Sequence, residues 1–143
     1  LGRSGMVSVK REGDGGTPIG TFRLLYGYFR ADRGAPPSSR LPMSPIGGDD
    51  GWCDALGDRN YNRPVQLPYP ASHERMRRDD RLYDVVIVMD HNITSRMTRG
   101  GSAIFFHIAK PYYPPTEGCV AISPADMRWL LPCIGPQTTM EIG

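Results

Sequence analysis

The amino-acid sequence predicts a mainly β domain with long loops and one short helix near its C-terminus. Three observations favour this fold class: short β-branched runs recur along the chain, 17 Gly and 14 Pro gather at the ends of those runs, and helical periodicity is confined to one segment. We expect the 143 residues to form one domain, 1–143, which is long enough to bury a hydrophobic core without disulfides or a metal.

The first expected elements are two β-prone runs at residues 6–10 and 19–25, separated by the sequence Glu12-Gly-Asp-Gly-Gly16. Because an Asp-Gly step and paired glycines supply positive φ, the runs predict an N-terminal hairpin. Residues 28–72 are dense in Pro, Gly, Asp and Arg and show little periodicity, which indicates a long loop over the domain.

The next elements are strands in the second half of the chain. Residues 84–89 form a continuous β-branched run, which predicts a strand buried on both faces. In a second strand, 103–108, alternation places Phe105 and His107 on one face and the intervening residues on the other. A strand resumes at 119–122, so we expect His107 and Cys119 at facing ends of neighbouring strands.

The C-terminal helix has the sequence signals of a helix start. Ser123 is a suitable N-cap, Pro124 takes the first helical position, and Asp126 is an acid at the third. Apolar residues at 127, 130 and 131 give the helix a buried face, Pro132 ends it, and residues 138–142 predict a last strand.

Composition excludes several classes of partner. A net charge of +2 is too small to indicate nucleic acid, and no apolar run approaches eighteen residues, so we expect no nucleic-acid partner and no stable membrane insertion. No signal peptide is visible in this chain. The histidines and Cys119 lack the short paired spacing of metal sites, so we predict no metal. The oligomeric state stays open.

One histidine and one cysteine are joined by a proline-rich connection, from His107 to Cys119. A free thiol has a pKa of about 8.5, and a neighbouring imidazole can take its proton or stabilise the thiolate. The histidine precedes the cysteine, which is the reverse of the order in papain-like peptidases. The backbone amides of Gly118 and Cys119 are suited to binding a developing oxyanion. These residues therefore predict acyl transfer, whereas the structural alternative is a buried cysteine and a core histidine.

Three cysteines leave at least one thiol unpaired. We expect Cys119 to be the free one, with Cys53 and Cys133 either bridged to each other or buried singly.

Two separated segments resemble one known family. Thr17-Pro-Ile-Gly-Thr-Phe22, preceded by Gly13-Asp-Gly-Gly16, resembles the "GDxxTPxGxF" signature of the L,D-transpeptidase (YkuD) catalytic domain, and the His107 connection with Thr116-Glu-Gly-Cys119 resembles its "H…(S/T)xGC" motif. The resemblance spans residues 10–142. It implies an L,D-transpeptidase-type β-sandwich and a cysteine-dependent acyltransferase, with the segment 17–22 in a structural role.

In that family a cysteine thiolate attacks the carbonyl of a diaminopimelate residue in a peptidoglycan stem peptide, and an amine of a neighbouring stem resolves the thioester. The resemblance implies that Cys119 is the nucleophile, His107 the base and acid, Gly118 with Cys119 the oxyanion donors, and Thr116 the hydroxyl residue beside the substrate. It also implies no cofactor, donor and acceptor stem peptides as partners, and a periplasmic or other extracytoplasmic location at the cell wall.

Three features depart from the family pattern. Glu117 stands where many members have histidine, Ala121 stands where many have arginine or asparagine, and the separation of His107 from Cys119 is 119 − 107 = 12 residues, which is short. A carboxylate facing the sulfur would disfavour the thiolate, unless Glu117 points to solvent. These departures indicate a divergent subgroup. They leave open an L,D-carboxypeptidase or endopeptidase on the same fold, and a non-catalytic cell-wall-binding domain.

Further substrate-binding candidates lie in the long loop and after the first buried strand. An aromatic and polar cluster suits a peptide or a sugar, although such residues also serve as packing anchors; it consists of Trp52, Asp54, Asp58, Tyr61 and Asn62. His91 directly follows a buried strand, so it either reaches the site as a second imidazole or lies in a surface turn. His73 and Glu74 are expected to be exposed.

Overall fold

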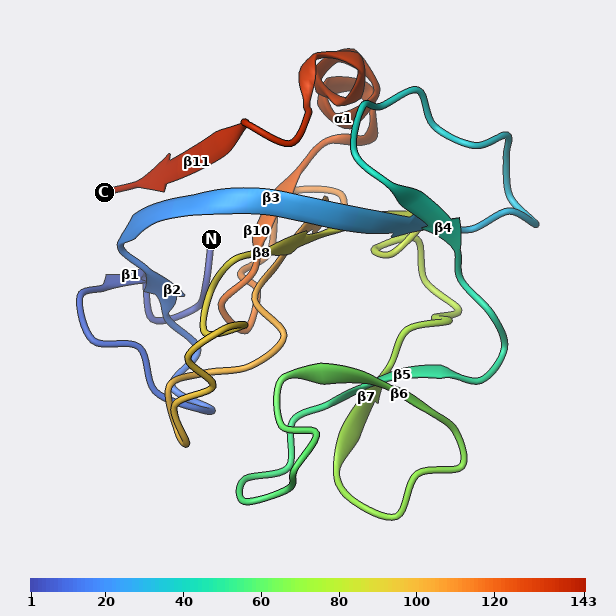
Figure 1. Ribbon diagram of the computed structural model, residues 1–143. Helices are drawn as coiled ribbons and strands as arrows, with labels where there is room; N and C mark the ends of the chain where they lie inside the picture. The colour runs from blue at the N-terminus through green and yellow to red at the C-terminus, as the bar shows by residue number, and fades with distance from the viewer.

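The computed structural model describes residues 1–143, and its architecture is mainly β, as predicted (Figure 1). A central six-stranded sheet has the order β10-β9-β8-β3-β11, with β4 paired to β3. Its strands are β3 (Gly20–Phe29), β4 (Met43–Pro45), β8 (Val85–Met89), β9 (Phe105–Ile108), β10 (Val120–Ile122) and β11 (Thr139–Ile142).

Two smaller sheets accompany the central one. Strands β5 (Asp50–Cys53), β6 (Arg63–Gln66) and β7 (His73–Arg75) form a three-stranded antiparallel sheet in the order β6-β5-β7. Strands β1 (Met6–Val7) and β2 (Thr17–Pro18) form a separate pair near the N-terminus.

The helix begins where the sequence predicts and ends one residue earlier than expected, at Leu130. Helix α1 (Pro124–Leu130) is capped by Ser123, whose Oγ accepts a hydrogen bond from the Asp126 amide at 3.1 Å. The chain then continues through Pro132 as a 3-10 turn, η1 (Leu131–Cys133). No helix combines the length and the apolar character that crossing a bilayer requires.

Strand β8 is buried on both faces, as predicted, because a different layer covers each face of the central sheet. Ile87 and Met89 belong to one core cluster, which α1 and η1 complete, whereas Val86 and Val88 belong to a second cluster that includes Trp52 of β5. Figure 1 shows α1 on one side of the central sheet and the three-stranded sheet on the other.

The predicted N-terminal hairpin is wrong. Strand β1 pairs with β2 in parallel, and the run at 19–25 belongs to the long strand β3. The Asp-Gly segment forms a wide loop instead of a tight turn, because the Asp14 carboxylate accepts hydrogen bonds from the backbone amides of Arg11 and Gly16 at 2.7 and 2.8 Å and from Lys10 Nζ at 2.5 Å.

The prediction of one long loop at 28–72 is also partly wrong. Strand β3 continues to Phe29, and β4, β5 and β6 lie within this range. These strands are only three or four residues long, and Gly51 and Pro64 interrupt their β pattern. Pro64 is tolerated because β6 is an edge strand.

All three cysteines are free, which confirms the expectation for Cys119 and excludes a bridge between the other two. Cys53 is buried, but Cys133 is exposed, so the expectation that it is buried is wrong.

Candidate active site

A cavity of about 550 Å³ opens where the central sheet meets the three-stranded sheet and the connection that follows β9. Its lining includes His107 and Ala121 of the central sheet with Cys119 directly before β10, and Glu74 of β7 with Asp54 directly after β5. The structure therefore brings the predicted nucleophile and the predicted base into one cavity. The segment 17–22 contributes nothing to this lining and lies in β2 and β3.

Cys119 lies directly before β10, and its thiol is held by backbone groups of Ala103 and Phe105, at the start of β9. Its thiol donates a hydrogen bond to the Ala103 carbonyl at 3.2 Å, and the Phe105 amide donates to Sγ at 3.4 Å. Burial, followed by the negative charge of Glu74, raises the pKa of Cys119 to about 12, although the Phe105 amide and Lys10 oppose the shift. The resting residue is a neutral thiol.

The sequence predicted that His107 and Cys119 lie at facing ends of neighbouring strands. The structure instead places them on the same face of adjacent strands, offset along the strand direction. Strands β9 and β10 run parallel, with His107 in register with Ala121, so Cys119 precedes that partner by two residues. Two residues correspond to about 6.6 Å along the strand. No hydrogen bond joins the two side chains, so proton transfer between them requires a bridging water or rotation of the cysteine.

The His107 imidazole is held in the tautomer that a base needs. His107 as a residue is 3% exposed, and its Nδ1 lies 2.9 Å from the Ile108 carbonyl oxygen. Because a carbonyl only accepts, we assign the proton to Nδ1, which leaves a lone pair on Nε2. Burial lowers the pKa of His107 below 6.5, so the ring is neutral near pH 7. Tyr83 packs edge-on against it at a centroid distance of 5.4 Å.

The turn before Cys119 is fixed by Thr116. The Thr116 hydroxyl donates to the Cys119 carbonyl oxygen at 2.6 Å and accepts from the Gly118 amide at 3.2 Å. The Gly118 amide is thus already occupied, whereas the Cys119 amide has no hydrogen-bond partner within the protein. Gly118 has φ +130°, and a Cβ at this position would lie 2.7 Å from the Gly16 carbonyl oxygen.

Glu117 points to solvent, so its carboxylate does not face the Cys119 sulfur. Its side chain is 78% exposed and pairs with Arg3 at 2.9 Å. The negative charge that acts on the sulfur comes instead from Glu74.

Glu74 was expected at the surface, but it lines the cavity with only 27% of its side chain exposed. It accepts a hydrogen bond from the Tyr83 hydroxyl at 2.6 Å and pairs with Arg78 at 3.4 Å. Burial raises the pKa of the Glu74 carboxyl above its usual range. No local pattern signals these residues, because the pairing of β7 with β5 and a distant loop bring them to the cysteine.

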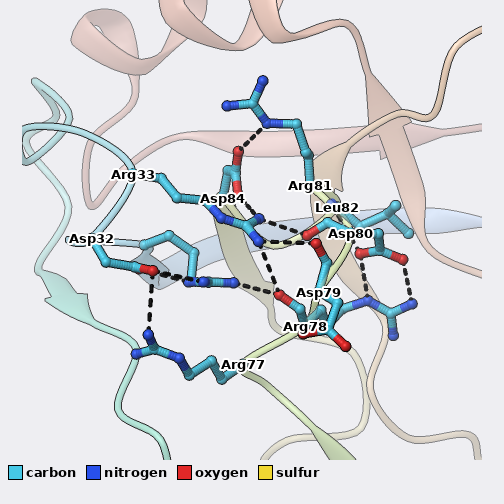
Figure 2. A network of polar contacts seen from close by, with 10 residues as sticks. Asp32, Arg33, Arg77, Arg78, Asp79, Asp80, Arg81, Leu82 and Asp84 are labelled. Atoms are coloured by element: carbon cyan, nitrogen blue, oxygen red, sulfur yellow. Dashed lines mark hydrogen bonds and ion pairs between the residues drawn. The ribbon is translucent and has the colours of Figure 1, made fainter.

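The loop that carries Arg78 and Tyr83 is fixed by the ionic network in Figure 2. Arg78 binds Asp80 through two hydrogen bonds of 2.8 and 2.7 Å, which hold the pKa of the Asp80 carboxyl below its usual value. The Arg78 carbonyl oxygen accepts hydrogen bonds from the guanidinium groups of Arg30 and Arg33, and Arg33 pairs with Asp84 at 2.6 Å. The position of Arg78 in the cavity wall is therefore fixed both through its side chain, which binds Asp80, and through its backbone carbonyl, which binds Arg30 and Arg33.

Trp52 and Asn62, predicted to contact substrate, lie behind the cavity wall and not in its lining. Each is 1% exposed. The Asn62 Oδ1 accepts hydrogen bonds from Trp52 Nε1 and from the Ala103 amide, both at 3.0 Å. They are therefore connected to the site through Ala103, which contacts the thiol.

Tyr61 and His91 also lie outside the cavity lining. The Tyr61 hydroxyl donates to the carboxylate of Glu12, a residue of the lining, at 2.5 Å. The His91 Nε2 lies 2.9 Å from the Gly100 carbonyl oxygen, and burial lowers its pKa. Tyr61 thus supports the cavity wall through Glu12, while the His91 ring is directed to another loop.

Comparison with known proteins gives one match. A family model described as the L,D-transpeptidase catalytic domain (YkuD) matches residues 1–142. No curated protein and no solved structure gives a significant match.

Proposed function

Because this chain belongs to the L,D-transpeptidase catalytic domain family, we propose that it crosslinks peptidoglycan stem peptides through a thioester on Cys119. One observation supports this activity most directly. A cysteine and a neutral histidine share a face of the central sheet and line one cavity of about 550 Å³, which is large enough for a peptide segment.

In the acylation step, Cys119 Sγ attacks the carbonyl carbon of the donor peptide, at a diaminopimelate residue in this family. The thiol proton moves to His107 Nε2, directly or through a water, as the carbon–sulfur bond forms. His107 then returns this proton to the leaving amine as the amide carbon–nitrogen bond breaks. The Cys119 amide is the free donor to the oxyanion.

In the second step an acceptor decides the product. An amine attacks the thioester, its proton passes to His107, and a new amide forms while the Cys119 thiol is regenerated. Water in the same position would give an L,D-carboxypeptidase or endopeptidase, which is the second candidate. The neutral resting thiol favours a mechanism in which deprotonation accompanies the attack.

In this proposal the other predicted residues do not react with the substrate but position the groups that do. Thr116 orients the turn that presents Cys119, and Gly118 allows its backbone conformation. Trp52 and Asn62 position the Ala103 carbonyl that holds the thiol, and they are positioning residues. Because the substrate is the cell wall, the proposed location is outside the cytoplasmic membrane.

The test is intact mass spectrometry of the protein incubated with purified muropeptides, together with analysis of the products. We expect an acyl adduct and crosslinked dimers with the wild type and with Cys133→Ala, which removes an exposed thiol, but neither with Cys119→Ala. Shortened stems without dimers would identify the hydrolase. A folded wild type that gives no adduct and no product, yet sediments with cell wall, would identify a non-catalytic wall-binding domain.

A further inference from the structure

The first three residues, Leu1, Gly2 and Arg3, form a short segment, the N-terminal strap, that pairs with the turn before Cys119. The Thr116 amide donates a hydrogen bond to the Leu1 carbonyl oxygen at 3.0 Å, and the Arg3 amide donates to the Thr116 carbonyl oxygen at 2.8 Å. Gly2 thus faces Thr116 in a parallel β-bridge. The strap therefore binds both backbone polar groups of Thr116, while the hydroxyl of Thr116 binds the Cys119 carbonyl oxygen.

The strap also packs directly on the glycine that precedes the nucleophile. A Cβ on Gly2 would lie 3.1 Å from the Gly118 Cα, and a Cβ on Gly118 would lie 2.7 Å from the Gly16 carbonyl oxygen. Three backbone segments therefore meet at this turn with no side chain between them. Because such close packing leaves no free space, a displacement of the strap also displaces the turn.

One buried hydroxyl group holds the strap in place. The Thr17 Oγ1 accepts a hydrogen bond from the Gly2 amide at 2.8 Å, and both residues are buried. Thr17 is itself fixed in β2, where its amide donates to the Gly5 carbonyl oxygen at 2.8 Å. The Gly2 amide makes no other hydrogen bond. Without the Thr17 hydroxyl, this buried donor would be left unsatisfied, which is costly.

We propose that Thr17 is a positioning residue for the nucleophile and acts through Gly2 and Thr116. Each link is a direct contact: the Thr17 hydroxyl binds the strap, the strap binds Thr116, and Thr116 binds the Cys119 backbone. The Cys119 amide, the free donor to the oxyanion, belongs to the same turn, so its direction also depends on the strap. Thr17 therefore contributes to the reaction although it does not line the cavity. The effect on acylation rests on the function proposed above, whereas the path of contacts does not.

The first test is amide hydrogen exchange measured by NMR, which needs no substrate. Thr17→Val removes the hydroxyl and keeps the branched shape, whereas Thr17→Ser keeps the hydroxyl. In Thr17→Val the Arg3 and Thr116 amides should exchange about tenfold to a hundredfold faster, because loss of the buried hydrogen bond favours opening of the strap. Thr17→Ser should restore exchange close to the wild-type rate.

The matched control is Thr138→Val. The Thr138 Oγ1 also accepts a hydrogen bond from a backbone amide, that of Gly135 at 2.9 Å, but it lies directly before β11 and outside the cavity lining. This variant should leave the exchange of the Thr116 amide unchanged. An unchanged rate in Thr17→Val, or an equal acceleration by both valine variants, overturns the inference.

The wild type provides a test that does not depend on the folding of Thr17→Val. The Arg3 and Thr116 amides should show similar protection from exchange, because the strap and the turn open as one unit. Protection factors that differ by more than about tenfold, or 1.4 kcal/mol, would separate the strap from the turn and overturn the inference.

The second test is the rate constant of Cys119 acylation at increasing concentrations of a muropeptide donor, expressed per folded protein. In Thr17→Val the saturating rate constant should fall about tenfold to a hundredfold, because the nucleophile is misplaced. The donor concentration that gives half of this rate should change less than about twofold, because the cavity lining is intact. Thr17→Ser should recover the rate. A merely structural role would reduce the amount of folded protein and leave its saturating rate constant as in the wild type.

Failure of this inference is distinguishable from failure of the proposed function. Acylation of Thr17→Val at the wild-type rate would remove Thr17 from the mechanism and keep the enzyme. Thr17-dependent exchange of the Thr116 amide, without any acylation of the wild type, would keep the path from Thr17 to Cys119 and remove the transpeptidase.

Discussion

The carbonyl oxygen of Ala103 accepts the hydrogen bond of the Cys119 thiol at 3.2 Å, and the amide of the same Ala103 is held by Asn62. The nucleophile is thus connected, through one residue with φ +51°, to a buried amide that Trp52 also contacts. A non-glycine residue at positive φ is uncommon, so these hydrogen bonds over-determine its conformation.

Trp52→Phe tests this connection, because it removes the indole N–H and keeps the aromatic contact with Phe105. We expect a loss of about 2 to 4 kcal/mol in the free energy of unfolding, because the variant loses a buried hydrogen bond and leaves the space of the missing indole ring unfilled. The acylation rate constant should fall about threefold to tenfold, because the thiol is held less accurately. Urea denaturation and intact mass against time measure the two effects. Trp129→Phe, at a side chain 74% exposed, should change neither; equal effects of both variants would argue against the connection.

Glu74→Gln should make Cys119 more reactive. Removing the negative charge stabilises the thiolate and lowers the pKa of Cys119, and one unit corresponds to about a tenfold change in thiolate fraction. We expect alkylation by iodoacetamide at pH 8 to accelerate about threefold to tenfold, with the site confirmed by peptide mapping. Glu117→Gln alters a carboxylate that faces solvent and should leave the rate as it is. An unchanged rate in Glu74→Gln would mean that this carboxylate does not act on the sulfur.

His107→Gln should lower the acylation rate by about 10²- to 10⁴-fold, the usual contribution of a general base. The wild-type rate should fall only when the pH drops through the lowered pKa of His107, so the acid limb should lie below pH 6.5 and disappear in the variant. Acylation followed by mass spectrometry gives both quantities when it is measured from about pH 4.5 to about pH 8.5, which is about two units on either side of the ordinary imidazole pKa. His73→Gln, outside the cavity, is the control. A wild-type profile that keeps its limb after the substitution would assign the limb to another group.

Gly118→Ala should destabilise the protein by about 2 kcal/mol or more, because the position has positive φ and the added methyl meets the Gly16 carbonyl. Gly34→Ala has open space and an ordinary backbone, so it should change stability by less than about 1 kcal/mol. The midpoints of urea unfolding compare the two. Similar midpoints would show that the turn before Cys119 tolerates a side chain.

Asp80→Asn should lower the free energy of unfolding by about 1 kcal/mol at neutral pH, because it breaks the paired contact with Arg78. The folded pKa of Asp80 is depressed, so its contribution is complete above the unfolded value of 3.8 and is lost as the pH falls through the folded value. The difference from the wild type should therefore persist at pH 5 and shrink below 3.8. Asp79→Asn, whose exposed side chain makes no ion pair, should show no such difference by urea unfolding.

The sequence was sufficient to predict those elements whose formation depends on residues close together in the chain. The β-branched run that became β8, the alternation of Phe105 and His107 on β9, and the cap at Ser123 were all predicted, because each depends on neighbouring residues. The pairing of β1 with β2 and the three-stranded sheet were not, because strands of two to four residues are specified by long-range partners.

The same distinction holds for the candidate site. The motif residues His107 and Cys119 were identifiable by type and order, and they line one cavity. Glu74 was expected at the surface because its sequence neighbours are polar, whereas its burial depends on β5 and on Tyr83. Asn62 was predicted to contact substrate because the sequence does not show which distant residues cover it. The structure places it behind the cavity lining, where it is buried.

The hydrogen bond from the Cys119 thiol to Ala103, together with the nearby charge of Glu74, has a consequence for the protein's durability. Peroxides and disulfides react with thiolates, and a thiol with a pKa of about 12 is almost entirely protonated near neutrality. Between encounters with substrate the nucleophile is therefore protected from conversion to sulfenic acid or mixed disulfide. Exposed Cys133, and not Cys119, should be the first residue that oxidants modify.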